Sequence, residues 1–449
     1  MDTGDTAWVL VCAALVLLMT PGLALFYGGM VRAKSVLNMM MMSFGALALV
    51  AVLWALFGYS LAFGDDVGGV LGNPAQFAGL GDLLGTTGAA HHFVATHLVG
   101  TVPAMAFVAF QATFAAVTVA LISGAIADRA RFGPWLVFAG VWLVVVYSPV
   151  AHWVFAVDGL AARTGGWLVN ELHVVDFAGG TVVEINAGAA GLALALVLGK
   201  RRGFGRDPMR PHNLTLVMAG AGLLWFGWLG FNAGSALGAN GQAAEVLVAT
   251  LLAMAAGTFG WLAIERVRDG HATSLGAASG LVAGGVAITP SCSSVTPVGA
   301  LLVGAVAGVV CALAVGLKYR WGYDDSLDVV GVHFVGGVWG TLAIGLLASP
   351  AASAGATGLL YGGGLDQLWR QAVAVVVVTA WSFLVSAAIG WLVQRTLGFR
   401  LAPEDEMTGI DSVVHAETAY DLDALGGGHP IPPRGQSAAE ARLPGSDHG

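Results

Sequence analysis

The sequence predicts an all-α polytopic membrane protein with eleven transmembrane helices, its N-terminus outside and its C-terminus inside. Of its 449 residues, 57% are hydrophobic and only 10% are charged, and the mean hydropathy is +0.79. A soluble protein of this length needs far more charged surface. Eleven long apolar runs and a regular alternation of basic connections between them support the same prediction.

Each apolar run is long enough to cross a hydrocarbon core of about 30 Å. The runs cover residues 6–30, 40–63, 98–124, 134–155, 178–199, 213–232, 244–265, 272–290, 297–317, 330–348 and 371–394. The first run lacks a basic leader, so we expect a transmembrane helix there and not a cleavable signal. The eighth run is short and rich in glycine, which suits helices that pack backbone to backbone.

The basic residues give the orientation. Of the 19 Lys and Arg residues, Arg434 and Arg442 lie far out in the tail, and only Arg163 and Arg370 would face outward if the N-terminus is outside. The remainder fall on every second connection, and this excess of basic residues marks the inner side of a membrane. These inner residues are Arg32, Lys34, Arg129, Arg131, Lys200, Arg201, Arg202, Arg206, Arg210, Arg266, Arg268, Lys318, Arg320, Arg395 and Arg400.

The composition divides the chain into a transmembrane domain, residues 1–399, and a cytoplasmic tail, residues 400–449. The tail is polar and acidic and contains proline. We expect a short helix near 403–406 and disorder after Gly426. Cys12, Cys292 and Cys311 are too few and too scattered for a disulfide framework or a metal site, so we expect no metal and no cofactor. The net charge of −8 is not that of a nucleic-acid-binding protein.

The fifth and tenth runs share a pattern that indicates an internal repeat. Small residues follow Glu184 and His333 at the same offsets of +3, +4 and +7, forming one smooth helical face. They are Ala187, Gly188, Gly191, Gly336, Gly337 and Gly340. Two five-helix halves, with one extra helix, would have opposite orientations, and a binding path would lie between them. Because glycine is abundant, a chance match is the alternative.

Glu184 is the only carboxylate well inside a run. Counted from Asp176 it lies about 12 Å deep, where an unpartnered charge is costly, so a functional role is the default. The alternative is a protonated glutamate that ties two helices together. His333 is its natural partner, although it lies only about 8 Å from Asp328. If the two meet, they titrate as a coupled pair; otherwise His333 is a packing histidine.

Asp176 and the aromatic residues each have a structural alternative. An aspartate before a helix caps free N–H groups, and direct cation binding by Asp176 is the second reading. Phe110, Phe114, Phe155 and Phe231 lie within predicted spans, where an isolated phenylalanine usually serves packing.

Several segments resemble the signatures of the ammonium transporter family (Amt/Mep, related to Rh proteins), and together they run from about Trp8 to Tyr420. The segments are DFAGGTVVEINAG at 176–188, GWLGFNAGS at 227–235, DVVGVHFVGG at 328–337, FQATF at 110–114, SGAIADR at 123–129 and PHN at 211–213. Several independent motifs in the right order make the resemblance specific.

The resemblance implies a homotrimer in the cell membrane with one pore per subunit, carrying ammonium or ammonia and the analogue methylammonium. It implies a recruitment site for the cation, a gate, and a pore pair that relays a proton. The positions are Phe114, Phe155 and Ser235 for recruitment, with Asp176 in a structural role beside them; Phe114 and Phe231 for the gate; Glu184 and His333 for the pair; and Trp228 for the pore lining.

Two residues depart from the family pattern. Glu184 occupies a position where most members carry the first of two histidines, a variant that the resemblance associates with some fungal-type members. Phe155 replaces the usual tryptophan of the recruitment site and offers a weaker cation–π face. Trp153 lies two residues away, which on a helix points elsewhere. The departures affect the expected affinity more than the substrate class.

Physical chemistry explains why such a pore would suit ammonium. Deprotonating ammonium at pH 7 costs at most roughly 5 kcal/mol if its pKa is close to that of lysine, whereas moving a bare cation through an apolar pore costs tens of kcal/mol in the Born limit. Aromatic rings and a hydroxyl hold the cation outside by about 1–2 kcal/mol each. We therefore expect ammonia to cross an apolar lumen while the proton crosses through Glu184 and His333, with net charge movement.

Three other functions remain as alternatives: an electroneutral ammonia gas channel of the Rh type, an ammonium sensor, and a membrane-embedded enzyme. The enzyme is disfavoured because the sequence contains no metal-ligand spacing such as H-E-x-x-H. The segments 403–411 and 415–420 resemble the family's cytoplasmic tail, which couples subunits and helps to dock a PII-type signalling protein. The alternative for these segments is a solvated acidic tail.

Overall fold

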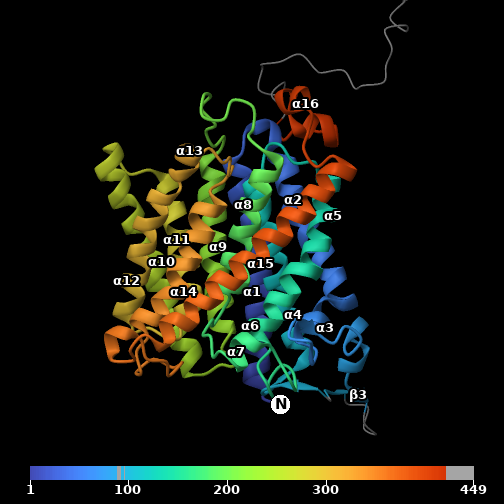
Figure 1. Ribbon diagram of the computed structural model, residues 1–449, viewed down its shortest axis with the longest axis vertical. Helices are drawn as coiled ribbons and strands as arrows, with labels where there is room; N and C mark the ends of the chain where they lie inside the picture. Colours follow the sequence, from blue (N-terminus) through green and yellow to red (C-terminus); the bar gives the residue numbers. More distant parts are fainter. Residues whose placement is uncertain (88–92, 96, 421–449) are drawn as a thin grey trace, which may run out of the picture.

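The computed structural model describes residues 1–87, 93–95 and 97–420, and these form a bundle of long helices that run along one axis (Figure 1). The N-terminus lies at one end of the bundle and the last helix, α16, at the other. We call these the N-terminal end and the tail end. Within the described residues, ten helical segments are long and apolar enough to cross a membrane. The predicted class, an all-α polytopic membrane protein, is confirmed.

The spanning segments combine several α-helices with short 3₁₀ or π turns. They are α1 (Thr3–Met30); η1 (Ala33–Ser35), α2 (Val36–Leu53), η2 (Trp54–Gly58) and α3 (Tyr59–Phe63); α4 (Ala104–Ile122) and η4 (Ser123–Ile126); α5 (Phe132–Trp142), η5 (Leu143–Tyr147) and α6 (Ser148–Phe155); η6 (Gly180–Ile185) and α8 (Asn186–Leu198); α9 (Leu214–Gly234); α10 (Gly241–Asp269); α12 (Pro297–Ala314) and α13 (Leu317–Trp321); η7 (Val330–Phe334) and α14 (Val335–Leu347); and α15 (Asp366–Leu397).

The eighth predicted run corresponds to α11 (Ser274–Ser291), which packs against α9, α10, α12 and α14. Every residue of α11 from 278 to 291 is buried. A helix enclosed by protein needs no lipid-facing apolar surface, and small residues let its neighbours approach closely. This environment explains why its hydrophobic signal in the sequence is weak.

The remaining elements are short and lie at the two ends of the bundle. They are η3 (Ala78–Leu83), α7 (Trp167–Asn170), η8 (Leu359–Tyr361), α16 (Pro403–Thr408), η9 (Asp411–His415), and three antiparallel hairpins formed by β1 (Asp66–Val67) with β2 (Leu71–Gly72), β3 (Thr86–Thr87) with β4 (Phe93–Val94), and β5 (Leu98–Val99) with β6 (Val102–Pro103). The third predicted run therefore begins too early, because 98–103 form a hairpin and the helix starts at Ala104.

One glycine of each predicted small-residue face packs against the segment that carries the other face. A Cβ atom on Gly188 would lie 2.5 Å from Cβ of Phe334, and one on Gly337 would lie 2.9 Å from Cβ of Glu184. Each glycine thus sits against the π turn of the other segment, beside its ionisable residue. Glycine permits this approach because it has no side chain. The close packing that the pattern predicted is confirmed.

A network of buried ion pairs closes the tail end of the bundle. Arg201 holds Asp324 through two hydrogen bonds of 2.8 and 2.9 Å and also contacts Asp128 at 3.1 Å. Asp128 pairs with Arg32 at 3.2 Å, and Arg129 lies 3.8 Å from Asp324. Because buried charges must be paired, this network fixes the connections after η4, α8 and α13 relative to one another.

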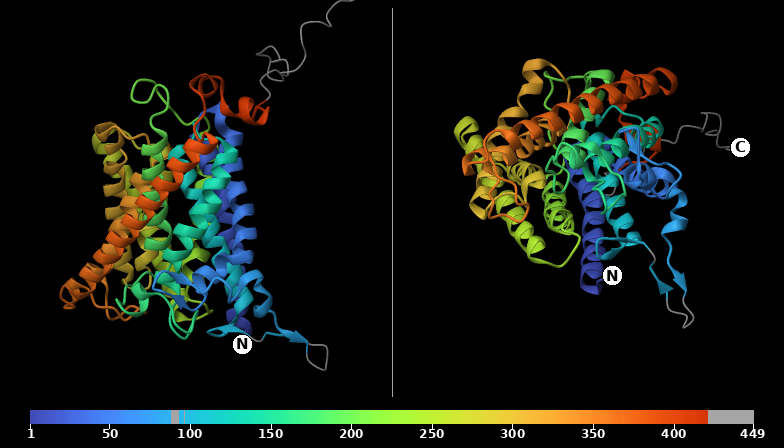
Figure 2. Two further views of the ribbon diagram at one scale, coloured as in Figure 1. Left: turned by 45° about the vertical axis from the view of Figure 1, so that its right-hand side comes forward. Right: turned by 60° about the horizontal axis from the view of Figure 1, so that its bottom comes forward.

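The first part of the tail folds back onto this end, while α15 runs diagonally across the outside of the bundle (Figure 2). The carboxylate of Asp411 accepts hydrogen bonds from the backbone N–H groups of Leu37 and Asn38 at the start of α2, at 3.0 and 2.8 Å. Glu406 in α16 pairs with Arg400 at 3.1 Å. The disorder expected after Gly426 lies outside the described residues.

We predict that Gly340→Ala destabilises the bundle, because its Cβ would lie 2.0 Å from the carbonyl oxygen of Ala287 in α11. Overpacking of this kind typically costs about 1–3 kcal/mol. Thermal unfolding in detergent should show a lower melting temperature. Gly222→Ala is the matched control, since nothing lies within 4 Å of the added carbon. Equal melting temperatures for the two variants would contradict the close packing.

Candidate functional site

A hollow of about 290 Å³ opens at the N-terminal end of the bundle. Three residues predicted from the sequence line it together: Phe155 at the end of α6, Asp176 before η6, and Ser235 after α9. The hydroxyl of Ser235 donates a hydrogen bond to the carbonyl oxygen of Phe231 at 3.0 Å, and its oxygen lone pairs remain available as acceptors. The hollow thus combines an aromatic face with oxygen acceptors, as a site for a small cation requires.

Trp153 does not take the place of the recruitment tryptophan. Its indole N–H donates to the carbonyl oxygen of Val70 at 2.8 Å, and its ring packs against Trp381 with centroids 5.5 Å apart. Trp153 is not among the residues that line the hollow, whereas Phe155 is. The expectation that a helix would direct these two side chains differently is confirmed.

A pair of stacked phenylalanines lies next to this region. The rings of Phe114 from α4 and Phe231 from α9 have centroids 3.9 Å apart and planes within 13° of parallel, and each side chain is 1% exposed. Phe110 packs against Phe114 at 4.8 Å. The stack brings together the two residues predicted as the gate.

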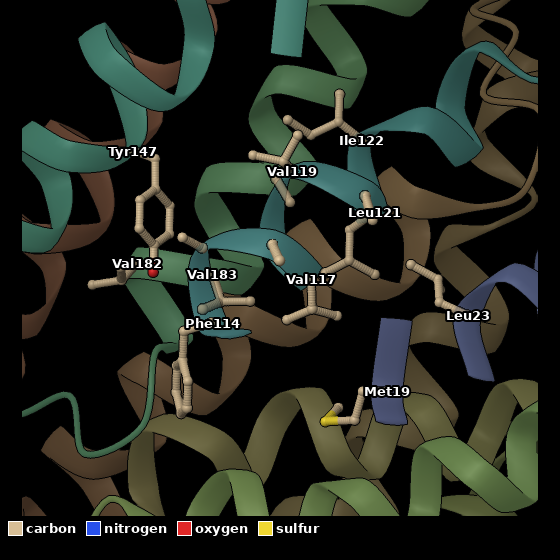
Figure 3. Close-up of a cluster of buried hydrophobic side chains, with 14 of the residues drawn as sticks. Met19, Leu23, Phe114, Val117, Val119, Leu121, Ile122, Tyr147, Val182 and Val183 are labelled. Atoms are coloured by element: carbon tan, nitrogen blue, oxygen red, sulfur yellow. The ribbon is translucent and has the colours of Figure 1, made fainter. Parts of the chain in front are cut away.

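A small cavity begins on the other side of Phe231. It offers about 20 Å³ to the centre of a water-sized molecule, enough for roughly one such molecule. Its wall is almost entirely apolar. Figure 3 labels some of the lining side chains, among them Met19 and Leu23 of α1 and Val117 and Leu121 of α4. The lining residues are Met19, Leu23, Phe26, Val117, Leu121, Val183, Leu224, Phe231 and Val282, with Glu184, Trp228 and His333.

Glu184 and His333 meet in this cavity. The Nδ1 atom of His333 lies 2.6 Å from Oε2 of Glu184, and the two residues are 5% and 1% exposed. The contact is short enough for a charge-assisted hydrogen bond. Each residue sits in a π turn, η7 or η6, a local geometry that is frequent at functional sites.

Trp228 is fixed by hydrogen bonds that involve Thr289 and Asn232, two residues that the sequence analysis did not identify. Its indole N–H donates to the hydroxyl of Thr289 in α11 at 2.8 Å, and that hydroxyl also lies 3.3 Å from the amide oxygen of Asn232. These bonds fix the ring at the cavity wall. Threonine and asparagine carry no distinguishing spacing here, so no signal in the sequence could have identified them.

Asp176 caps the first pore segment. Its carboxylate accepts from the backbone N–H groups of Gly179, Gly180 and Thr181 at 2.7–2.8 Å, and also from the hydroxyl of Thr181 at 2.5 Å. Four donors satisfy both oxygens, so the carboxylate orients the start of η6. The capping role, one of two expected from the sequence, is present in this geometry.

Asp325 occupies the matching position in the second segment. It accepts from the N–H groups of Val329 and Val330 at 3.1 and 2.7 Å and precedes His333 by eight residues, as Asp176 precedes Glu184. The depth of about 8 Å expected for His333 is therefore too small, because it is measured from Asp328 and not from Asp325. Counted from the equivalent residue, both members of the pair lie about 12 Å along their segments.

Asp325 lies outside the spanning segments and is fully buried beside Asp328 and Lys318. Burial and the neighbouring carboxylate of Asp328 raise the pKa of Asp325 to about 6, while Lys318 and the backbone hydrogen bonds oppose the shift. Lys318 bonds to the carboxylate of Asp328 at 2.6 Å and to the carbonyl oxygen of Asp325 at 3.0 Å. The cap of the second segment is thus sensitive to proton concentration.

Fold and site together define a polytopic membrane protein with a hollow at one end, a small and almost entirely apolar cavity and a buried acid–imidazole pair, the class of a small-solute transporter. The family model of the Ammonium Transporter Family matches residues 7–420, and the chain belongs to this family. It transports ammonium across the cell membrane as a multi-pass protein and is not an enzyme.

Individual relatives agree with this assignment. The chain is 60% identical over 445 residues to an ammonium transporter of Mycobacterium bovis, covering 96% of this chain and 93% of the relative. It resembles the crystal structure of Saccharomyces cerevisiae Mep2 with a TM-score of 0.79 and 34% identity, covering 90% and 88% of the two chains. A solved sensor Amt protein gives a TM-score of 0.81 at 28% identity, covering 92% and 98%.

We predict that Asp325 makes stability fall as pH rises. Its pKa in the folded protein lies above the value of about 4 for an unfolded aspartate, so the folded state binds this proton more tightly. The contribution, on the order of 3 kcal/mol, is present below pH ~4 and lost as pH passes about 6. Melting temperatures between pH 4.5 and 7.5 should fall less in Asp325→Asn than in the parent protein, and equal slopes would contradict this.

Proposed function

We propose that the protein captures ammonium in the outer hollow, deprotonates it, and conducts ammonia through the apolar cavity while Glu184 and His333 relay the proton. The observation that carries the proposal is the 2.6 Å contact between these two side chains in a cavity that is otherwise apolar. The cation would first lie against the ring of Phe155 and the oxygen of Ser235, which line one hollow.

The size and polarity of the cavity support deprotonation. About one water-sized molecule fits, so an ion entering it would leave its hydration shell behind. Apolar walls cannot replace that shell, and the Born cost of a bare cation is tens of kcal/mol. Ammonium avoids this cost by losing a proton for at most roughly 5 kcal/mol at pH 7. Potassium has no equivalent route, which accounts for selectivity.

Glu184 and His333 can accept the proton that ammonium loses. An N–H bond of ammonium breaks, its electron pair stays on nitrogen, and the proton adds to the Glu184 carboxylate or to the free Nε2 of His333. Because these groups share a hydrogen bond, a proton taken up by one of them can be released from the other. Ammonia and a proton then reach the far side separately, and one positive charge has crossed.

Membership of the family supports a proposal about the assembly and its regulation. We propose a homotrimer with one pore in each subunit, and a PII-type signalling protein at the tail end. The docked tail supports this, because Asp411 binds the start of α2 while Glu406 accepts a hydrogen bond from the backbone N–H of Arg202 at 2.7 Å. A partner that moved the tail would act on both connections at once.

An electroneutral gas channel and an ammonium sensor remain the alternatives. A gas channel needs no titratable carboxylate in its lumen, whereas Glu184 lines the cavity and contacts His333. The solved sensor shares the fold at 28% identity, whereas an ammonium transporter of Mycobacterium bovis is 60% identical to the chain. Charge movement distinguishes all three, because a gas channel carries nitrogen without current and a sensor carries little of either.

We predict that Glu184→Gln lowers the ammonium-evoked current at least tenfold, because the amide keeps the size of the side chain but cannot titrate. The parent protein in liposomes on a supporting membrane should give a current with ammonium and methylammonium but not with potassium. Glu245→Gln is the control, since Glu245 bonds to Ser353 at the bundle end and does not line the cavity. An unchanged current and selectivity in Glu184→Gln would refute the relay.

We predict that Phe155→Trp lowers the half-saturating ammonium concentration about two- to fivefold, because an indole binds cations more strongly by roughly 0.5–1 kcal/mol. The same current assay measures this value. Phe259→Trp, at a side chain that is 73% exposed on α10, is the control and should leave the value unchanged. A half-saturating concentration that stays constant in Phe155→Trp would remove Phe155 from the recruitment site.

A further inference from the structure

The loop between α8 and α9 carries a dense group of exposed cations at the tail end, beside α13 (Figure 1). We call it the basic patch: Lys200, Arg202, Arg206 and Arg210 on the loop, and Arg320 on α13. All five side chains are exposed. Arg201, the remaining cation of the loop, is buried in the ion-pair network. The chain as a whole has a net charge of −8, so the charge of the basic patch is opposite in sign to the net charge of the protein.

Orientation in the membrane does not by itself explain the patch. Most of the other basic groups at this end are neutralised or hydrogen-bonded: Arg32 by Asp128, Lys318 by Asp328, Arg400 by Glu406, and Arg131 by the carbonyl oxygens of Leu397 and Gly398. Within the described residues, by contrast, the guanidinium groups of Arg202, Arg206 and Arg210 make no ion pair or hydrogen bond. These groups are available to a ligand.

Aromatic side chains flank the cations. Phe204 stacks on Tyr319 with centroids 5.5 Å apart and planes 8° from parallel, and Nζ of Lys200 lies 5.9 Å from the Phe204 ring centre. Tyr319 and Trp321 on α13 are 64% and 69% exposed. Tyrosine and tryptophan at the end of a spanning segment are typical of the headgroup level of a bilayer.

The loop also forms a hollow of about 480 Å³, lined by Lys200, Arg202, Phe204, Arg206, Asp207 and Met407. Gly203 and Gly205 have φ angles of 83° and 75°, which lets the loop curl around this space. Asp207 is the single carboxylate of the lining. A volume of this size suits a compact ligand. Because most charged residues of the lining are Lys and Arg, the ligand should be an anion.

We propose that the basic patch binds the headgroup of an anionic phospholipid, with the phosphate on Arg202 and Arg206 and the acyl chains passing down the bundle beside α13. Three features favour a lipid over a soluble anion. The loop begins two residues after the end of α8, exposed interfacial aromatics adjoin it, and clusters of Lys and Arg next to a membrane segment bind anionic lipids.

Titration of the detergent-solubilised full chain with short-chain phosphatidylglycerol tests the proposal, with thermal stabilisation or native mass spectrometry as the readout. The variant Arg202→Gln/Arg206→Gln should bind about 25-fold more weakly, because each basic side chain near an anionic headgroup contributes about fivefold. Phosphatidylcholine should give no comparable stabilisation. Free glycerophosphoglycerol, which carries the same phosphodiester headgroup without acyl chains, should bind far more weakly than the lipid.

Arg266→Gln/Arg395→Gln is the matched control, since it removes the same charge from two exposed side chains at the same end, and its affinity should stay within twofold of the parent. If the test variant fails to fold, Arg206→Gln/Arg210→Gln replaces it. Equal losses in test and control variants would overturn the proposal, as would glycerophosphoglycerol binding as tightly as the lipid. Unchanged lipid binding in the test variant would overturn it as well.

Discussion

The structure depends on holding a carboxylate and an imidazole together inside an apolar bundle. Glu184 and His333 are 2.6 Å apart and almost fully buried, a placement that is costly unless each group satisfies the other. Their backbones must therefore approach closely and keep a fixed register. The caps, the π turns and the glycine contacts around them all serve this one requirement.

Equivalent contacts hold the two segments that carry Glu184 and His333 in this arrangement. Asp176 and Asp325 cap the two segments at the same distance before the pair, and Gly188 and Gly337 let each segment pack on the π turn of the other. A side chain at either glycine would push the segments apart, and loss of either cap would free the backbone that carries the pair. The two caps differ in environment, since Asp176 borders the open hollow whereas Asp325 is buried beside Lys318.

The sequence sufficed for features that depend on local composition or fixed spacing. Hydropathy located the spans, and the offsets after Glu184 and His333 identified the contacting faces. The sequence was less informative where the environment is set by tertiary packing. Helix α11 is hidden by its neighbours, and Thr289 supports Trp228 through a contact between distant segments. The role of Asp325 was accessible in principle, since its spacing to His333 equals that of Asp176 to Glu184.

The proposed mechanism places two barriers of very different height along the route of the solute. Separating the stacked rings of Phe114 and Phe231 forfeits an aromatic interaction of about 0.5–1.5 kcal/mol, which thermal motion supplies readily. Carrying a cation through the apolar cavity beyond costs far more. In the proposed mechanism the stack therefore regulates access without selecting among solutes. Selection would then occur in the cavity, which has room for about one small molecule beside the Glu184–His333 pair, so that only a protonated base could leave its charge behind and continue.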